Sequence, residues 1–286
     1  MKSYNIALDV RRILEFFEIN KDFFLESIGL SRMQLSRLFK NEDKPSKATL
    51  EKIYGYIYNR GIDFNKGKES LFIDNKNGRL LLFHGTGVDI QGDIDTKHST
   101  PPNDFGDGFY VGESLKQGAT WVCDKDYASV YAFYFNDSGS KKVLFDVDRK
   151  WLYAILYYRN AFRSFEINEE VKNIIKEVES ADIVVAPIAD NQMFKTIDSF
   201  ARREITDEAC LHALSATNLG MQYVFKSDKA CQKLEFIDRL YLCREEKEHY
   251  KKIKEGLDAE GVTKARLAIT EYRREGKYFD EIFKRK

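Results

Sequence analysis

The apolar residues of this chain follow two different spacings, and the change between them near residue 60 most constrains the fold. Before it, apolar side chains recur every three or four residues, as at Ile6, Val10, Ile13 and Leu14, which places them on one helix face. After residue 78 the chain shows short apolar runs separated by turn residues, a pattern typical of strands. This change excludes an all-helical and an all-β protein, and it predicts an α+β chain with a helical front part.

The apolar spacing in the front part predicts four short helices. Asn20, Ser31 and Ser46 have side chains that can cap the first turns of the second, third and fourth helices. Gly29 can end the second helix in a tight turn. We interpret residues 59–67 as the end of the fourth helix and a short connection.

The rest of the chain predicts interspersed strands and helices, and then a charged helical tail from about Arg244. The alternating aromatic residues Tyr131, Phe133 and Phe135 are expected in the core, as is Trp121. The expected strands cover residues 80–84, 108–112, 143–147, 183–188 and 221–225, and the expected helices cover residues 115–123, 149–158, 168–177 and 207–213. These patterns predict a helical domain over residues 1–68, an α+β domain over residues 79–240 and a tail over residues 241–286.

Composition limits the cellular compartment, the metal sites and the kinds of partner expected of this chain. It has no apolar run that could span a membrane, and its N-terminus does not have the pattern of a signal peptide, so we expect a cytoplasmic protein. The four cysteines are widely spaced, which favours free thiols over a zinc or other metal site. The net charge is zero, yet residues 1–68 carry +4 and residues 69–243 carry −7, which indicates different partners for the two parts.

The segment 23–57 resembles the helix-turn-helix of the Cro and λ-repressor type, through its Gly-Leu-Ser turn and the Lys-Pro-Ser that precedes the next helix, and the resemblance covers about residues 5–60. The resemblance implies that the helix after the turn enters the major groove of DNA. The side chains expected to contact DNA are Ser31, Arg32, Gln34, Ser36, Arg37 and Lys40. The alternative is a helical bundle for protein contact, and a single small module that binds DNA would imply a homodimer.

Three segments of the middle domain combine glycine, aromatic and polar residues in ways that suit a ligand. Leu81 to Thr86 is a buried strand ending in His-Gly-Thr, in which a glycine allows a ligand close to the backbone. Asp104 to Tyr110 is a glycine-framed turn that leads into a strand with two aromatic residues, one of which can stack on a flat ring. The strand 221–225 carries Gln222 between apolar neighbours, where simple alternation would turn it outward.

In this order the three segments resemble the ADP-ribosyltransferase superfamily, in its histidine–tyrosine–glutamate branch, and most closely a bacterial family of uncharacterised ADP-ribosyltransferase-like proteins. The resemblance covers about residues 79–235 and implies a split β-sheet domain that binds NAD as a substrate, without a metal. It implies that His84 bonds the adenosine ribose, Gly85 pairs with the carboxamide, and Tyr110 stacks on nicotinamide. The residues implied to bind NAD are His84, Gly85, Thr86, Asp104, Phe105, Gly106, Gly108, Phe109, Tyr110 and Asn191.

The chain departs from this branch at Gln222, which stands where the branch has its catalytic glutamate. A glutamine can orient the ribose 2′-hydroxyl but cannot act as a general base. Three readings remain open: transfer mainly by positioning, a different acid, or binding without turnover. The candidate acids are Asp104, Asp107, Glu113 and Asp190.

The function expected from these features is a bacterial mono-ADP-ribosyltransferase of the toxin or phage-defence type. His84, Tyr110 and Gln222 would carry the chemistry, and the acceptor would be a nucleic acid or a protein. An NAD glycohydrolase, with water as acceptor, is a close variant. The main alternative is a non-catalytic transcription regulator that senses NAD or ADP-ribose, and toxin-like domains of this kind are expected to have a neutralising antitoxin protein as partner.

Overall fold

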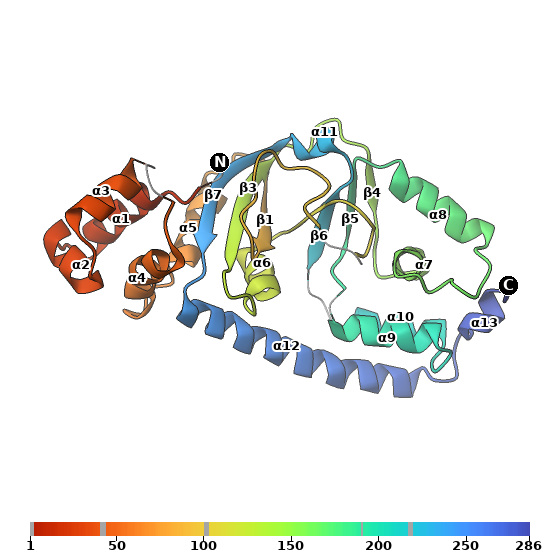
Figure 1. Cartoon of the computed structure of the whole chain (residues 1–286). Coiled ribbons are helices and arrows are strands. Elements are labelled where there is room, and N and C mark those ends of the chain that lie inside the picture. The colour runs from red at the N-terminus through yellow and green to blue at the C-terminus, as the bar shows by residue number, and fades with distance from the viewer. Residues whose placement is uncertain (1–2, 41–43, 100–102, 190, 217–219) are drawn as a thin grey trace. The chain divides into compact units, whose positions relative to one another are not determined.

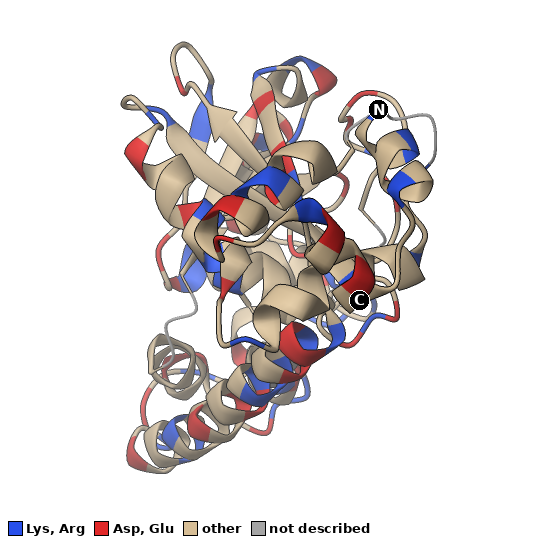
Figure 2. Cartoon of the chain, turned by 90° about the vertical axis from the view of Figure 1, so that its left-hand side faces the viewer, with Lys and Arg blue, Asp and Glu red and all other residues tan. Residues whose placement is uncertain are grey.

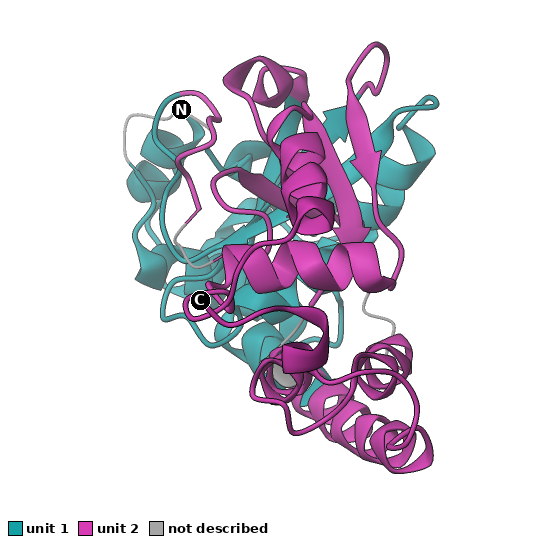
Figure 3. Ribbon diagram, turned by 90° about the vertical axis from the view of Figure 1, so that its right-hand side faces the viewer, with its two compact units in different colours: residues 1–92, 114–135, 235–253 teal, residues 93–113, 136–234, 254–286 magenta. Residues whose placement is uncertain are grey.

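The structure is a computed structural model, and it describes the chain except residues 1–2, 41–43, 100–102, 190 and 217–219. The chain divides into two compact units, each built from several stretches of sequence (Figure 3). Unit 1 comprises residues 1–92, 114–135 and 235–253, and unit 2 comprises residues 93–113, 136–234 and 254–286. Within the described residues, no helix combines the length and the apolar character needed to cross a membrane.

Unit 1 begins with a group of short helices, as the apolar spacing predicts (Figure 1). The caps are confirmed, because the side chains of Asn20, Ser31 and Ser46 each accept a hydrogen bond from the backbone of the helix that follows. Gly29 adopts a φ of 61°, the left-handed conformation that ends α2. The helices are α1 (Ile6–Phe16), α2 (Lys21–Ile28), α3 (Arg32–Phe39), α4 (Lys47–Tyr58) and α5 (Phe64–Asp74).

The connection predicted over residues 59–67 is wrong in its second half, because α5 begins at Phe64. Its first turn is capped by Asp63, whose carboxylate accepts a hydrogen bond from the backbone of Lys66 at 3.0 Å. The inward face of α5 carries Asn65 and Lys68, which are 2% and 1% exposed. Polar residues at buried positions hide the apolar stripe by which a helix is usually recognised.

The buried Lys68 joins three elements of unit 1 through charges. Its ammonium group lies 2.8 Å from a carboxylate oxygen of Asp9 in α1 and 2.6 Å from one of Asp238. The hydroxyl of Tyr54 in α4 also donates to Asp9, at 2.7 Å. A buried charge is tolerated only when it is paired, so these partners depend on one another.

Seven strands form a mixed sheet, and three of them belong almost entirely to unit 1, in the order β1 (Leu80–Thr86), β3 (Ser129–Phe135) and β7 (Leu234–Tyr241). β1 and β3 pair antiparallel, with His84 opposite Tyr131. β3 is buried along its whole length, which confirms the predicted core role of its aromatic residues. Helix α6 (Leu115–Val122) packs on β1 and β3, but its Trp121 is 65% exposed, so the prediction of a core tryptophan is wrong.

Unit 2 contains the other four strands, in the order β4, β5, β6 and β2. β4 (Lys142–Leu144) and β5 (Ile183–Pro187) are parallel, whereas β5–β6 and β6–β2 are antiparallel. β6 (Met221–Phe225) begins and ends where its apolar pattern predicts, and Gln222 lies opposite Gly112 of β2 (Phe109–Gly112).

Helices complete unit 2 around an aromatic core. The helices are α7 (Arg149–Tyr158), α8 (Glu169–Glu179), α9 (Asn191–Ala201), α10 (Asp207–Ser215), α11 (Asp228–Cys231) and α13 (Phe279–Ile282). The charged tail forms α12 (Arg244–Glu271), whose residues belong to both units. Trp151, Phe200 and Phe279 are fully buried within the core of unit 2.

Candidate functional site

Unit 2 contains a buried polar cluster around Asp104, which we call the Asp104 centre and define as Asp104, Arg159 and Gln222. Asp104 is 7% exposed, and each of its carboxylate oxygens has a partner from a different element. Oδ1 accepts a hydrogen bond from Nη2 of Arg159, just after α7, at 2.8 Å. Oδ2 accepts one from Nε2 of Gln222 in β6, at 3.0 Å. The cluster therefore brings a carboxylate to the side chain at the predicted catalytic position.

Simple alternation would turn Gln222 outward, but its side chain is only 8% exposed and therefore faces inward. Its amide nitrogen donates to Asp104 and also to the carbonyl oxygen of Pro187, at 3.2 Å. A primary amide has two hydrogens, and these two bonds use both of them. The orientation of the amide is thereby set, and the role left to its Oε1 is that of an acceptor.

The turn that precedes Tyr110 is held by hydrogen bonds from several directions. The hydroxyl of Tyr110 donates to the carbonyl of Gly106 at 2.7 Å and accepts from the backbone N–H of Phe105 at 3.1 Å. The ammonium group of Lys226 donates to the carbonyls of Phe105 and Asp107, at 2.5 and 2.8 Å. The half-buried Tyr110 ring is therefore oriented without any help from a ligand.

The glycines of this turn are required by packing as well as by backbone shape. Gly106 has a φ of 71°, and a Cβ there would lie 2.9 Å from the ring of Tyr158. A Cβ on Gly108 would lie 2.7 Å from a methyl group of Val224 in β6. The glycine-framed turn can thus approach α7 and β6 closely.

Burial controls the electrostatics of the Asp104 centre. Desolvation raises the pKa of the Asp104 carboxyl, although the hydrogen bonds from Arg159 and Gln222 oppose this effect. Desolvation also raises the pKa of Tyr110 and lowers that of Lys226. The guanidinium of Arg159 lies over the ring of Phe194, 3.6 Å from its centroid, which holds the cation in place beside Asp104.

The predicted residues of the His-Gly-Thr segment belong to unit 1 and are half-buried at the end of β1. Gly85 has a packing role of its own, because a Cβ at this position would lie 2.1 Å from the carbonyl oxygen of Gly118 in α6. The hydroxyl of Thr86 accepts a hydrogen bond from the backbone N–H of Val88 at 3.2 Å. Close approach of helix and strand therefore explains this glycine before any ligand is considered.

The other predicted ligand residues have varied surroundings. Phe105 and Phe109 are fully buried, and Phe105 stacks on Phe145 with ring centroids 5.3 Å apart. Asn191 begins α9, but its side chain lies outside the described part of the structure, as does Asp190 altogether. The structure brings Asp104, Phe105, Gly106, Gly108, Tyr110 and Gln222 together in unit 2, and His84, Gly85 and Thr86 together in unit 1.

Two residues of the site were not predicted from the sequence, namely Arg159 of the Asp104 centre and Lys226, which binds the turn before Tyr110. Arg159 is the first residue after α7, where a basic side chain commonly favours the helix end, so its position gives no sign of a buried partner. Lys226 directly follows β6 and has the appearance of a solvated strand end. Of the candidate acids, Glu113 bonds the backbone N–H of Met221 at 3.2 Å, and Asp107 is exposed.

The predicted DNA-contact residues of α3 all have exposed side chains, as a recognition helix requires. Three of them, Ser31, Arg32 and Gln34, also have partners within the helical region. Nε of Arg32 donates to the Asp22 carboxylate at 2.7 Å, and the side chain of Gln34 completes a capping box with Ser31. Lys and Arg are interspersed with Asp and Glu in the view of Figure 2.

Comparison with known proteins places the chain in a family without assigning it a reaction. No group of metal-ligating side chains occurs among the residues that the structure describes. Searches of curated proteins and of solved structures gave no match. A family model matches residues 80–236, which is more than half of the chain and includes β1 through the start of β7. The chain therefore belongs to the family described as Protein of unknown function (DUF3990).

Proposed function

We propose that the chain is an ADP-ribosyltransferase-like enzyme that binds NAD and transfers its ADP-ribose to a macromolecular acceptor. The observation that best supports the proposal is the 3.0 Å hydrogen bond from Gln222 to Asp104. It puts a carboxylate directly behind the amide that replaces the expected glutamate. Asp104 would thus supply the negative charge that the glutamine lacks.

In the proposed reaction an acceptor nucleophile forms a bond to C1 of the nicotinamide ribose while the bond from C1 to nicotinamide breaks. The bonding electrons leave with nicotinamide, and the acceptor proton passes to water. Positive charge develops on the ribose during this step, and a preorganised negative group stabilises it. Oε1 of Gln222 would accept a hydrogen bond from the ribose 2′-hydroxyl, and Asp104 would polarise the amide from its nitrogen side.

The remaining roles in the proposal follow the resemblance. Tyr110, whose ring orientation is set by its bonds to the preceding turn, would stack on nicotinamide with little further ordering. His84 would bond the adenosine ribose, and the backbone of Gly85 would pair with the carboxamide. The exposed residues of α3 would bring the enzyme to DNA, as substrate or as docking partner.

One observation favours a second candidate, a sensor that binds NAD or ADP-ribose without turnover. Both oxygens of Asp104 already accept hydrogen bonds, from Arg159 and Gln222. A carboxylate engaged in this way is well suited to holding the turn before Tyr110 and β6 together. The same geometry therefore supports ligand binding even if no bond is broken.

The test measures nicotinamide release from NAD by the purified full chain, with DNA, RNA or lysate protein as acceptor. Asp104→Asn should abolish acceptor-dependent release, whereas the matched control Glu113→Gln should retain it. Retained release in Asp104→Asn would refute the role of Asp104. Saturable NAD binding without release, lost in Tyr110→Ala, would favour the sensor.

A further inference from the structure

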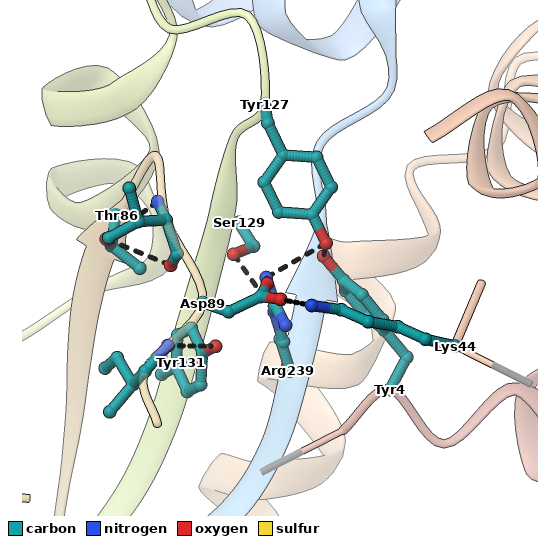
Figure 4. Close-up of polar contacts among 10 residues, drawn as sticks. Tyr4, Lys44, Thr86, Asp89, Tyr127, Ser129, Tyr131 and Arg239 are labelled. Carbon is teal, nitrogen blue, oxygen red and sulfur yellow. Dashed lines mark hydrogen bonds and ion pairs between the residues drawn. The ribbon is translucent and has the colours of Figure 1, made fainter. Parts of the chain in front are cut away.

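Unit 1 contains a second buried cation, Arg239 of β7, which the proposed function does not use (Figure 4). Its side chain is 4% exposed, and Nη2 donates to the hydroxyl of Tyr127 at 2.9 Å and to the carboxylate of Asp89. Nε donates to the hydroxyl of Ser129 at 3.2 Å. The guanidinium also lies 4.4 Å from the ring centroid of Tyr4. Arg239 is thus held firmly by aromatic and polar groups.

The Asp89 carboxylate has a second cationic partner, and that partner is accessible to solvent. Oδ1 of Asp89 binds Arg239, whereas Oδ2 contacts the ammonium group of Lys44, as the dashed lines in Figure 4 show. Lys44 is 58% exposed and lies in the segment between α3 and α4. One carboxylate therefore joins an exposed cation of the helical region to a buried cation of the sheet.

Asp89 also belongs to the loop that continues β1 from the His-Gly-Thr segment. Within this loop Val88 bonds to Thr86, and the backbone N–H of Ile90 donates to the hydroxyl of Tyr131 at 3.2 Å. Tyr131 lies opposite His84 in the β1–β3 pair. A change in the pairing of Asp89 therefore acts on the loop next to His84.

We propose that Lys44 and Asp89 form a relay through which nucleic acid bound to the helical region alters the loop 86–90 and thereby the NAD affinity. DNA phosphates compete with Asp89 for the exposed Lys44, while the buried Arg239 keeps its place. Asp89 then has one cation instead of two, and the loop relaxes toward Arg239. Both the binding of DNA by the helical region and the final effect on NAD rest on the proposed function, but the response of the loop does not require NAD to bind.

The expected size of the effect follows from the exposure of Lys44. An exposed ion pair is weak, so its loss should change NAD affinity by about two- to fivefold. Coupling between two binding sites is reciprocal, so NAD should change DNA affinity by the same factor.

The experiment compares Lys44→Gln with the matched control Lys47→Gln in the full chain. Lys47 begins α4 and contacts Asp126, which is 89% exposed and outside the loop 86–90. The probe is a short mixed-sequence DNA duplex, and the readout is hydrogen exchange at the backbone amides of Val88 to Ile90. Each variant should lower the salt dependence of DNA binding by about one phosphate contact, a slope of about 0.9.

DNA should change the exchange of the loop in the unmodified chain and in Lys47→Gln, but not in Lys44→Gln. An unchanged loop upon DNA binding, an equal response in both variants, or no DNA binding by the unmodified chain would each overturn the relay. NAD titration without DNA is independent of these outcomes. If the loop responds but NAD does not bind, the coupling of Lys44 to the loop stands, whereas its effect on NAD and the proposed function fail.

Discussion

The amide nitrogen of Gln222 lies 3.0 Å from Oδ2 of Asp104, although the two residues are separated by more than a hundred positions in the chain. This contact changes what is expected of a glutamate at position 222. Resemblance to the transferase branch alone would predict that Gln222→Glu restores a missing catalytic group. The structure instead places the new carboxylate against an existing one, in a site shielded from water.

We predict that Gln222→Glu lowers the free energy of unfolding by about 1–3 kcal/mol, because a buried donor is lost and like charges meet. The double variant Asp104→Asn/Gln222→Glu should recover part of this loss, since it exchanges the amide and the carboxylate. Urea unfolding of the four chains gives the coupling as a double-mutant cycle. Strictly additive effects would show that the two side chains do not interact in solution.

Gly85→Ala is predicted to destabilise the protein by about 3 kcal/mol or more, because its Cβ would lie 2.1 Å from the Gly118 carbonyl oxygen. Backbone atoms must move to relieve such a contact. The control is Gly67→Ala in α5, where a Cβ meets nothing within 4 Å and should stabilise the helix by about 0.5–1 kcal/mol. Thermal unfolding in which both variants behave alike would contradict the close packing of α6 on β1.

Lys68→Met should cost about 3–5 kcal/mol at neutral pH, because the carboxylates of Asp9 and Asp238 lose their shared cation in the core. The matched control is Arg32→Met, which breaks an ion pair exposed to solvent and should have little effect. Burial already raises the pKa of Asp238, and removing Lys68 should raise it further. The stability lost in Lys68→Met should therefore become smaller as the pH falls. If denaturant unfolding shows the same loss at every pH, the two carboxylates are not buried in solution.

The pKa of Asp104 predicts the sign of one pH effect on stability. Burial raises this pKa above its usual 3.8, so the folded chain binds the proton more tightly than the unfolded chain. The contribution of Asp104 to stability should therefore fall as the pH rises from 3.8 through the raised pKa. Asp104→Asn lacks this group. The unfolding free energy of the variant, relative to that of the parent, should therefore increase as the pH rises between about pH 4 and pH 7. A constant difference across this range would mean that the carboxyl group titrates normally.

Local patterns predicted much of the secondary structure. Helix α7 begins and ends at the predicted residues because Asp148 caps its first turn, accepting from the backbone of Trp151. The strand β6 was equally clear from its apolar run. Strand β7 was not predicted, because Asp238 and Arg239 interrupt its pattern, and both are nevertheless buried. Their partners come from distant segments, which no local pattern can reveal.

The candidate site was predictable only in part. The resemblance identifies Gln222, and Asp104 is one of the four carboxylates expected as a replacement acid. The structure distinguishes Asp104 from the other described carboxylates of this set by its hydrogen bond to Gln222. This contact is long-range, because it forms only when the turn before Tyr110 packs against β6. Arg159 completes the centre, and nothing in its surroundings along the chain marks it as a buried partner.

The family match ends at residue 236, two residues before Asp238 and three before Arg239. These two side chains bind partners in the helical region, namely Asp238 with Lys68 and Arg239 with Tyr4. A chain shortened to begin at Leu80 would keep the whole family segment, but Asp238 would lose its cation Lys68 and Arg239 would lose the ring of Tyr4 while keeping Asp89. The border of the family match therefore differs from that of unit 1, which contains both the helical front and most of β7.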